Sequence, residues 1–422
     1  MTLSRRQLLA AGLAVPASFN AGATPRHGPR LIVVGAGFGG ATCAKYLRVL
    51  MPDAVITLID RRAQFYTGPF TNLVIAGLRT PHSIERDLAK IAEHHRVRLI
   101  VDEVTAIDTG KLQVSTARHG VHSADRIVIA PGVAMRWDAI EGLDPRHSEQ
   151  MPHAWLGDAQ LLSLRARVAA LADGATVLIA APPNPYRCPP GPYERASLIA
   201  AALTRAGRRR CKILIADAKD DFSKRALFQL EWDRLYPGLI AWIPRAENGE
   251  VVRVDTASNQ VWLRDANVSL KVDLASIIPP QRAADLATQH DLADESLWCP
   301  VDPASFESRR HAGIHVIGDA AQAAPMPKSG FSANSQAKLC AAAIAAALSG
   351  KPAPEPQLLN TCYSLVGESA AISVSGFYGA INGRLSALSE GMSPLSGDTA
   401  LREREARQAH AWYDSITADS FG

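Results

Sequence analysis

Apolar runs alternate with turn-forming stretches in the first third of the chain. The segment PRLIVVGAGFGGATCAKYLRVL, residues 29–50, predicts a buried strand, a glycine turn and a helix. AVITLIDRR predicts a strand that ends at Asp60. RLIVDEVTAID and DRIVIAPG predict later strands, with a hairpin between them in KLQVSTARHGVHSA. Strands that alternate with helices indicate an α/β domain with a mostly parallel sheet.

The rest of the chain continues this alternation. ATVLIAA (175–181) and CKILIAD (211–217) predict two parallel strands joined by a helix. QVWLRDANVSLKVDLASIIPP predicts a hairpin and a strand, GIHVIGDA a short buried strand, and SANSQAKLCAAAIAAALSG a long helix. The last thirty residues are polar and predict a helix. We therefore expect an α/β fold with boundaries near 145, 275 and 350.

Composition excludes some classes of function. The 422 residues suffice for two or three domains, and 47% hydrophobic with 20% charged residues is typical of a globular protein. The net charge is only +4, and no basic stripe carries interleaved aromatic residues, so we expect no nucleic-acid partner.

The first residues, 1–23, resemble an export leader. TLSRRQLLAAGLAVPASFNAGA has the paired Arg5 and Arg6, a short apolar stretch and small residues up to Ala23. This pattern indicates twin-arginine export to the periplasm; the alternative is an ordinary first helix with polar flanks. The apolar run is too short to span a bilayer, and no later segment has 18 uninterrupted apolar residues, so we expect no membrane insertion.

The chain has six cysteines, which are Cys43, Cys188, Cys211, Cys299, Cys340 and Cys362. None lies in a CxxC or CxxCH motif, so the chain attaches no c-type haem itself, and metal-finger spacing is absent too. A periplasmic setting permits disulfides, but spacing alone does not select a pair. Cys43, Cys211, Cys299 and Cys340 are expected to be buried and inert.

A dinucleotide-binding turn follows the first strand. Gly35, Gly37 and Gly40 form GxGxxG where the strand meets the helix, and Asp60 ends the next strand. The glycines allow the backbone to approach a pyrophosphate at the helix N-terminus, and the aspartate suits ribose hydroxyls. The sequence therefore predicts a bound dinucleotide.

The corresponding turn in the middle of the chain is different. ATVLIAA is followed by PPNPYRCPPGP, which has a single glycine and many prolines. Proline has no N–H to offer a phosphate and it stiffens the loop. We therefore expect no NAD(P)H at this turn, and a rigid loop that carries Cys188.

Two later motifs indicate which dinucleotide binds. GIHVIGDA and APG (130–132) resemble the second flavin motif and the crossover motif of two-dinucleotide flavoproteins, which favours FAD. The helix that begins near Ser329 would direct its positive end at the flavin. The alternative is that Asp319 only caps a turn. The FAD contacts expected here are Gly318, Asp319, Lys328, Ser329 and Gly330.

Longer strings resemble one family. PYRCPPGPYERAS, IIPPQRA, WCPVD, FES, GIHVIGDA, PMPKSGFSANSQ, LNTCYS and AWYDSITADSFG resemble the flavoprotein subunit of flavocytochrome c sulfide dehydrogenase, in order over the whole chain after the leader. The resemblance implies a glutathione-reductase-like α/β fold. It implies an FAD-binding domain (24–145 and 276–349), a second Rossmann-like domain without a nicotinamide fingerprint (146–275), and a C-terminal domain facing a cytochrome (350–422).

The resemblance also implies an activity. The family oxidises sulfide to zero-valent sulfur and passes electrons singly to a partner chain that carries c-type haem. Its redox-active disulfide matches Cys188 and Cys362, its acid/base carboxylate matches Glu194, and its aromatic residue near the cytochrome matches Trp412. From the residues alone, Glu194 is also a candidate helix cap, and the two cysteines are candidates for a purely structural disulfide. Arg187 and Arg195 either attract anions and favour a thiolate or are ordinary solvated or paired arginines.

One position departs from the family pattern. The family attaches FAD through a cysteine in a stretch where this chain reads FYTGPFTNLV, with Gly68 at the matching position. Glycine has no side chain for a thioether, so we expect noncovalent FAD. The departure leaves another reduced sulfur compound or thiol open as substrate, and also a non-enzymatic accessory role in sulfur oxidation. A quinone acceptor is disfavoured, because the tail TALREREARQAHAWYDSITADSFG is charged and lacks an apolar face for a membrane.

Overall fold

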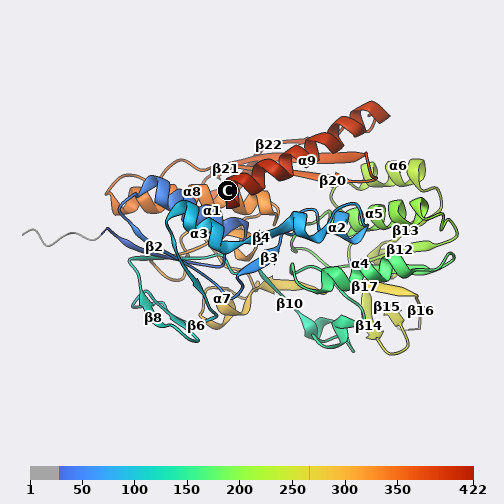
Figure 1. Ribbon diagram of the computed structural model, residues 1–422, viewed down its shortest axis with the longest axis horizontal. Helices are drawn as coiled ribbons and strands as arrows, with labels where there is room; N and C mark the ends of the chain where they lie inside the picture. The colour runs from blue at the N-terminus through green and yellow to red at the C-terminus, as the bar shows by residue number, and fades with distance from the viewer. Residues whose placement is uncertain (1–27, 266) are drawn as a thin grey trace, which may run out of the picture.

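Two parallel sheets lie side by side in the computed structural model, and a long C-terminal helix runs along both (Figure 1). The structure describes residues 28–265 and 267–422. The predicted leader lies outside these residues. The α/β class expected from the sequence is confirmed.

The first sheet has five strands in the order β19-β9-β1-β2-β5, and the pairs are parallel. Its strands are β1 (Arg30–Val34), β2 (Val55–Asp60), β5 (Arg98–Val101), β9 (Arg126–Ile129) and β19 (Ile314–Val316). The associated helices are α1 (Phe38–Leu50), α3 (Leu88–His95) and α8 (Gly330–Leu348), and α8 packs against α1. Residues 31–34 of the central strand are all buried, as expected for a parallel strand covered on both faces.

Smaller elements form separate two- and three-stranded sheets and short helices. They are β3 (Gln64–Tyr66), β4 (Glu85–Asp87), α2 (Thr71–Ile75), β6 (Val104–Asp108), β7 (Gln113–Thr116), β8 (Gly120–Ser123), β10 (Val133–Met135), β18 (Gln281–Ala283) and α7 (Asp285–Gln289). Five 3-10 turns complete the described elements: η1 (Pro81–Ile84), η2 (Trp137–Ala139), η3 (His147–Glu149), η4 (Arg245–Glu247) and η5 (Gly318–Ala320). The predicted strand RLIVDEVTAID is in fact two, β5 and β6, in different sheets. The break falls at Asp102, whose buried carboxylate accepts hydrogen bonds from the backbone of Arg118 and His119.

The second sheet has the order β13-β12-β11-β17, again all parallel. Its strands are β11 (Thr176–Ala181), β12 (Lys212–Asp217), β13 (Ile240–Ile243) and β17 (Leu274–Ile277). The surrounding elements are α4 (Gln160–Ala170), α5 (Gly191–Arg205), α6 (Arg225–Leu235), β14 (Val251–Asp255), β15 (Gln260–Leu263) and β16 (Ser269–Lys271). The predicted strand–helix–strand unit of β11, α5 and β12 is therefore present, and β17 spans the boundary predicted near 275.

The C-terminal region adds a sheet that the sequence reading missed. Strands β20 (Gln357–Leu365), β21 (Ala371–Ile381) and β22 (Arg384–Met392) pair antiparallel, and α9 (Thr399–Phe421) follows them. One end of α9 contacts α6, where buried Arg402 pairs with Glu231 at 2.8 Å. The other end contacts α1, where Thr42 donates to Ser420 at 2.9 Å. The helix thus fixes the second sheet relative to the first.

Candidate active site

The glycine turn after β1 is tightly closed on one side and open on the other. A Cβ at Gly40 would lie 1.7 Å from the Gly35 carbonyl oxygen, so only glycine fits there. A Cβ at Gly37, the N-cap of α1, would meet no atom within 4 Å. Asp60 accepts a hydrogen bond from the N–H of Ala36 at 2.8 Å and so braces the turn. This geometry is that of a backbone surface prepared for a phosphate group at a helix N-terminus.

Asp319 supplies an unsatisfied polar group on the same side of the first sheet. Its Oδ1 atom is buried and has no hydrogen-bond partner among the described residues. Burial raises the pKa of its carboxyl group, while the charges of Arg187 and Lys328 lower it. A buried acceptor without a donor is costly, so its presence indicates a ligand that donates a hydrogen bond. The ribityl chain of FAD carries such hydroxyl donors.

The other residues predicted to contact FAD lie around the start of α8. Ser329 caps α8 by accepting from the N–H of Ser332 at 2.9 Å, and Gly330 begins the helix. Gly318 donates its N–H to Gln336 at 2.8 Å. Lys328 donates to the carbonyls of Asp319 and Ala321 at 2.6 and 2.9 Å, and burial lowers its pKa to about 8. These contacts hold the loop from Gly318 to Gly330 against the first sheet.

Cys188 lies in the loop between β11 and α5, as predicted. It has a left-handed φ of 59°, and its N–H donates to the Lys328 carbonyl at 2.8 Å, which ties this loop to the start of α8. Its own carbonyl accepts from Gly191, the first residue of α5, at 2.8 Å. The thiol is half-buried just before the N-terminus of α5. A helix N-terminus stabilises a thiolate placed there.

Glu194 connects the Cys188 loop to the strand that carries Cys362. Its Oε1 accepts from the N–H of Leu365 on β20 at 2.9 Å, and its Oε2 accepts from Asn72 of α2 at 2.9 Å. Glu194 makes no capping hydrogen bond at the start of α5, and instead it joins three separate elements, α5, α2 and β20. Burial raises its pKa, although these two hydrogen bonds lower it.

The two cysteines share one electrostatic environment. Both are half-buried and unpaired in the structure, so their disulfide stays a prediction. Burial raises the pKa of Cys188, and charge on Cys362 and Glu194 raises it further. Burial also raises the pKa of Cys362, which Glu194 raises and Lys224 lowers. The structure thus brings Cys188, Cys362 and Glu194 together, as the family resemblance implied.

The two loop arginines play different roles. Arg195 is fully buried and donates to the carbonyls of His153 and Ala154 and to Ser276, at 2.6 to 3.0 Å, so it anchors α5 inside the protein. Burial lowers its pKa to about 9. The Arg187 guanidinium forms no ion pair with a described residue and donates only to the Trp155 carbonyl, while the backbone N–H of Arg187 donates to Gln281 at 2.9 Å. Its charge lowers the pKa of Cys188, so Arg187 is the cation of the loop.

Gly68 lies beside this cation. A Cβ at Gly68 would lie 3.6 Å from Nη2 of Arg187, an ordinary contact distance. The stretch that matches the flavin-attachment segment of the family therefore borders the Cys188 loop. A side chain would fit at this position, so the glycine does not result from lack of space.

Three residues of the site carry no sequence signal. Asn72 donates to both Glu194 and the Gly191 carbonyl, at 2.9 and 3.1 Å. Trp155 donates to the Arg187 carbonyl at 3.1 Å. Lys224 reaches from the start of α6 to β20. Each belongs to an element distant in sequence. Trp155 and Lys224 lie in no recognisable motif, and Asn72 lies in the stretch FYTGPFTNLV, where only Gly68 was singled out.

Trp412 lies between the two halves of the site. It projects from α9, and its ring stacks on Phe331 in the first turn of α8 with centroids 6.3 Å apart. The centroid of its ring also lies 6.2 Å from that of Tyr363, the neighbour of Cys362. The three aromatic rings lead from the start of α8 and from β20 to the C-terminal helix.

In the second sheet, side chains occupy the region at the carboxyl end of β12 where nicotinamide domains bind their nucleotide. Asp217 ends β12, where nicotinamide domains commonly place a ribose-binding acid. It is fully buried and accepts from Tyr193, Trp242 and Lys219, at 2.5 to 2.8 Å. Tyr193 in turn stacks on Phe222 with centroids 3.6 Å apart.

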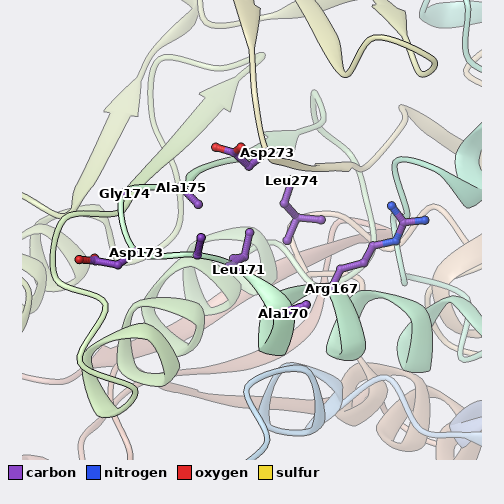
Figure 2. Close-up of a pocket in the computed structure, with 9 residues that line it drawn as sticks. Arg167, Ala170, Leu171, Asp173, Gly174, Ala175, Asp273 and Leu274 are labelled. Atoms are coloured by element: carbon purple, nitrogen blue, oxygen red, sulfur yellow. The ribbon is translucent and has the colours of Figure 1, made fainter.

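A surface hollow of about 560 Å³ lies at the opposite end of the second sheet (Figure 2). It is lined by Arg167, Ala170, Leu171, Ala172, Asp173, Gly174, Ala175, Asp273 and Leu274. Asp273 and Ala175 come just before β17 and β11, so the hollow borders the amino ends of these strands. Open α/β sheets bind ligands at the carboxyl ends of their strands, where Cys188 lies, so we assign no role to this hollow.

Comparison with known proteins identifies the domains in which these residues lie. A pyridine nucleotide-disulphide oxidoreductase model matches residues 29–167. The central model of the sulfide dehydrogenase (flavocytochrome c) flavoprotein chain matches 161–279, and the flavin-binding model of flavocytochrome c sulphide dehydrogenase matches 354–421.

Individual proteins agree with these matches. The sulfide dehydrogenase (flavocytochrome c) flavoprotein chain of Chlorobaculum thiosulfatiphilum is 53% identical over 45 residues, which are 11% of this chain and 94% of that sequence. The sulfide-quinone reductase of Aquifex aeolicus is 35% identical over 103 residues, only 24% of each chain.

Solved structures give the fold. The sulfide:quinone oxidoreductase of Aquifex aeolicus superposes with a TM-score of 0.73 at 19% identity, over 93% of this chain and 92% of that one. A putidaredoxin reductase, in its covalent complex with putidaredoxin, superposes with a TM-score of 0.63 at 16% identity, over 90% and 93%. The predicted two-dinucleotide flavoprotein fold is confirmed, and FAD is the dinucleotide that the glycine turn and Asp319 fit.

Proposed function

The chain belongs to the family of flavocytochrome c sulfide dehydrogenase flavoprotein chains, and from this premise we propose that it is a periplasmic sulfide:cytochrome c oxidoreductase subunit. One observation carries the proposal. Cys188, in the loop after β11, is hydrogen-bonded to Lys328 next to α8, and Glu194 of the following helix is hydrogen-bonded to β20, which carries Cys362. Both cysteines therefore have Glu194 and Lys224 as electrostatic neighbours beside the FAD-binding elements.

In the proposed reaction, hydrosulfide attacks one sulfur of a Cys188–Cys362 disulfide. A new S–S bond forms, the old one breaks, and its electron pair leaves on the other cysteine as a thiolate. Glu194 accepts the proton of the resulting persulfide, which its raised pKa suits. The N-terminus of α5 and Arg187 stabilise the thiolate of Cys188.

Bound FAD would supply the two-electron acceptor for that thiolate and the means to pass electrons on singly. The residues that would hold it are the turn from Gly35 to Gly40, Asp319 and the start of α8 at Ser329. Because Gly68 offers no sulfur, we propose that the protein binds FAD noncovalently.

We propose a c-type cytochrome as the electron acceptor, docked on the C-terminal sheet. Leu359, Ile381 and Leu388 are each about half exposed there, and Leu388 packs over Gly379. Alternate residues of a strand share a face, so Leu359 lies on the same face as Tyr363, which contacts Trp412. A haem protein on this apolar face would lie next to the aromatic residues that lead from the cysteines.

Other acceptors and donors have less support. No helix of the described residues is long and apolar enough to cross a membrane. NAD(P)H would have to displace the buried Tyr193 and Phe222 and the half-buried Trp242, and separate Asp217 from its three partners. The periplasmic location rests on the Arg5–Arg6 leader pattern and is tested by fractionating cells that express the full chain.

The experiment that tests the function compares electron acceptors. With sulfide as donor, the purified holoprotein should reduce cytochrome c and not a soluble quinone analogue. Cys188→Ser should abolish this reduction, whereas Cys211→Ser, at a buried cysteine of the same domain, should leave it unchanged. Preferential reduction of the quinone, or a fully active Cys188→Ser variant, would contradict the proposal.

A further inference from the structure

Lys224 is a buried cation that makes no salt bridge with a described residue, although Glu194 lies within its electrostatic reach. The Lys224 side chain is 3% exposed. Its Nζ atom donates to Ser364 Oγ at 2.8 Å and to the Cys362 carbonyl at 3.4 Å. Burying an ammonium group without a directly paired carboxylate is unfavourable, so a lysine at this place suits a site where a further negative charge forms nearby.

The backbone at Lys224 is also unusual. It has a φ of 65°, in the left-handed region, at the N-cap of α6. Residues with a Cβ disfavour this conformation, and such positions are retained where the surrounding structure holds them. The turn directs the side chain away from α6 and across to β20, where Cys362 lies.

The ionisable groups around the two sulfurs act on them unequally. Both Arg187 and Lys224 lower the pKa of Cys188, whereas Lys224 is the cation that lowers the pKa of Cys362. Glu194 opposes negative charge on either sulfur. Lys224 and Glu194 are therefore shared by both sulfurs, and Lys224 is the cation in hydrogen-bond contact with the strand that carries Cys362.

We propose that Lys224 is a positioning residue for Cys362, which stabilises negative charge on the Cys362 sulfur through its buried ammonium group. The proposal rests on the function proposed above and specifies which of the two cysteine sulfurs hydrosulfide attacks. Hydrosulfide attacks Cys362, the Cys188–Cys362 bond breaks, and the electron pair leaves on Cys188. The new persulfide on Cys362 gives its proton to Glu194, and the persulfide anion faces Lys224.

The test measures thiol reactivity and needs no sulfide. The holoprotein is reduced with dithiothreitol, freed of reductant and alkylated with iodoacetamide over a range of pH, and Cys188 and Cys362 are followed by peptide mass spectrometry. The other four cysteines are buried and serve as internal controls. Lys224→Met should slow Cys362 alkylation at neutral pH about tenfold, because less of the thiol is ionised. The midpoint of the curve of Cys362 alkylation rate against pH should rise by about one pH unit.

Two variants separate charge from structure. Lys224→Arg keeps the charge and should restore the wild-type profile. Ser364→Ala removes the 2.8 Å hydrogen bond but keeps the cation, and should leave the Cys362 midpoint unchanged. If Lys224→Met does not fold, Lys224→Gln, which keeps a donor for Ser364, replaces it. An unchanged profile in the neutral variant, or an equal shift in Ser364→Ala, would overturn the proposal even if the protein oxidises sulfide.

Discussion

Glu194 is the residue whose protonation should set the pH dependence of the reaction. Burial raises the pKa of Glu194 above the value of about 4.3 for an ordinary glutamate. As pH falls, Glu194 is therefore protonated, and loses its negative charge, before an ordinary glutamate does. A base must be unprotonated, so the rate of flavin reduction by sulfide should fall as pH falls through this raised pKa. Glu194→Gln should remove this fall in rate at low pH, the acid limb of the pH–rate profile, and slow flavin reduction by roughly 10²–10⁴-fold. Stopped-flow absorbance over pH measures both effects, and an unchanged limb in the variant would assign it to another group.

The proposal of noncovalent FAD rests on Gly68. With no sulfur at this position, acid denaturation should release all the flavin into solution. Mass spectrometry of the unfolded chain should then give the mass of the polypeptide alone. A chain that keeps the mass of one FAD would show that another residue forms the bond.

At this scale the sequence predicted the residues that belong to continuous motifs. The glycine turn, Asp319, Cys188 and Glu194 each lie in a recognisable string, and the structure places them around one site. Lys224 and Asn72 were not predicted. Their roles depend on which elements meet in space, and a lysine at a helix start or an asparagine in a short helix has no signal of its own.

At the scale of elements, Gly191 links the start of α5 to the thiol. A Cβ there would lie 2.5 Å from the Trp155 ring and 3.0 Å from the Cys188 sulfur, and neither group moves freely. Gly191→Ala should therefore displace the loop and destabilise the protein by about 1–3 kcal/mol. Thermal unfolding and the rate of Cys188 alkylation test this. Gly110→Ala is the control, because its Cβ would be at ordinary contact distance, and equal effects of the two variants would contradict the account.

Elements were predictable where apolar runs are long and continuous. The strands of both parallel sheets except β13, and helices α1, α5 and α8, were predicted from their patterns. The strands β21 and β22 were missed, because their exposed positions interrupt the apolar pattern. Likewise, β5 and β6 were read as one strand, because the sequence shows no turn residue such as glycine or proline at Asp102.

At the scale of the whole molecule, the exposed apolar residues of the C-terminal sheet should control electron delivery. Leu359→Asp and Leu388→Asp should each raise the KM for cytochrome c by roughly tenfold, since charged groups at an interface core weaken binding. Reduction of the flavin by sulfide should not change. Leu162→Asp, at a similarly exposed leucine on α4, is the control, and an equal effect there would exclude the C-terminal sheet as the docking surface.

The measurement that tests the central claim most directly is an anaerobic titration of the holoprotein with sulfide, followed by visible absorption. We predict that about one equivalent of sulfide bleaches the flavin and that Cys188→Ser and Cys362→Ser abolish the bleaching. A flavin that stays oxidised in sulfide, yet is reduced by dithionite, would contradict sulfide oxidation at the Cys188–Cys362 site.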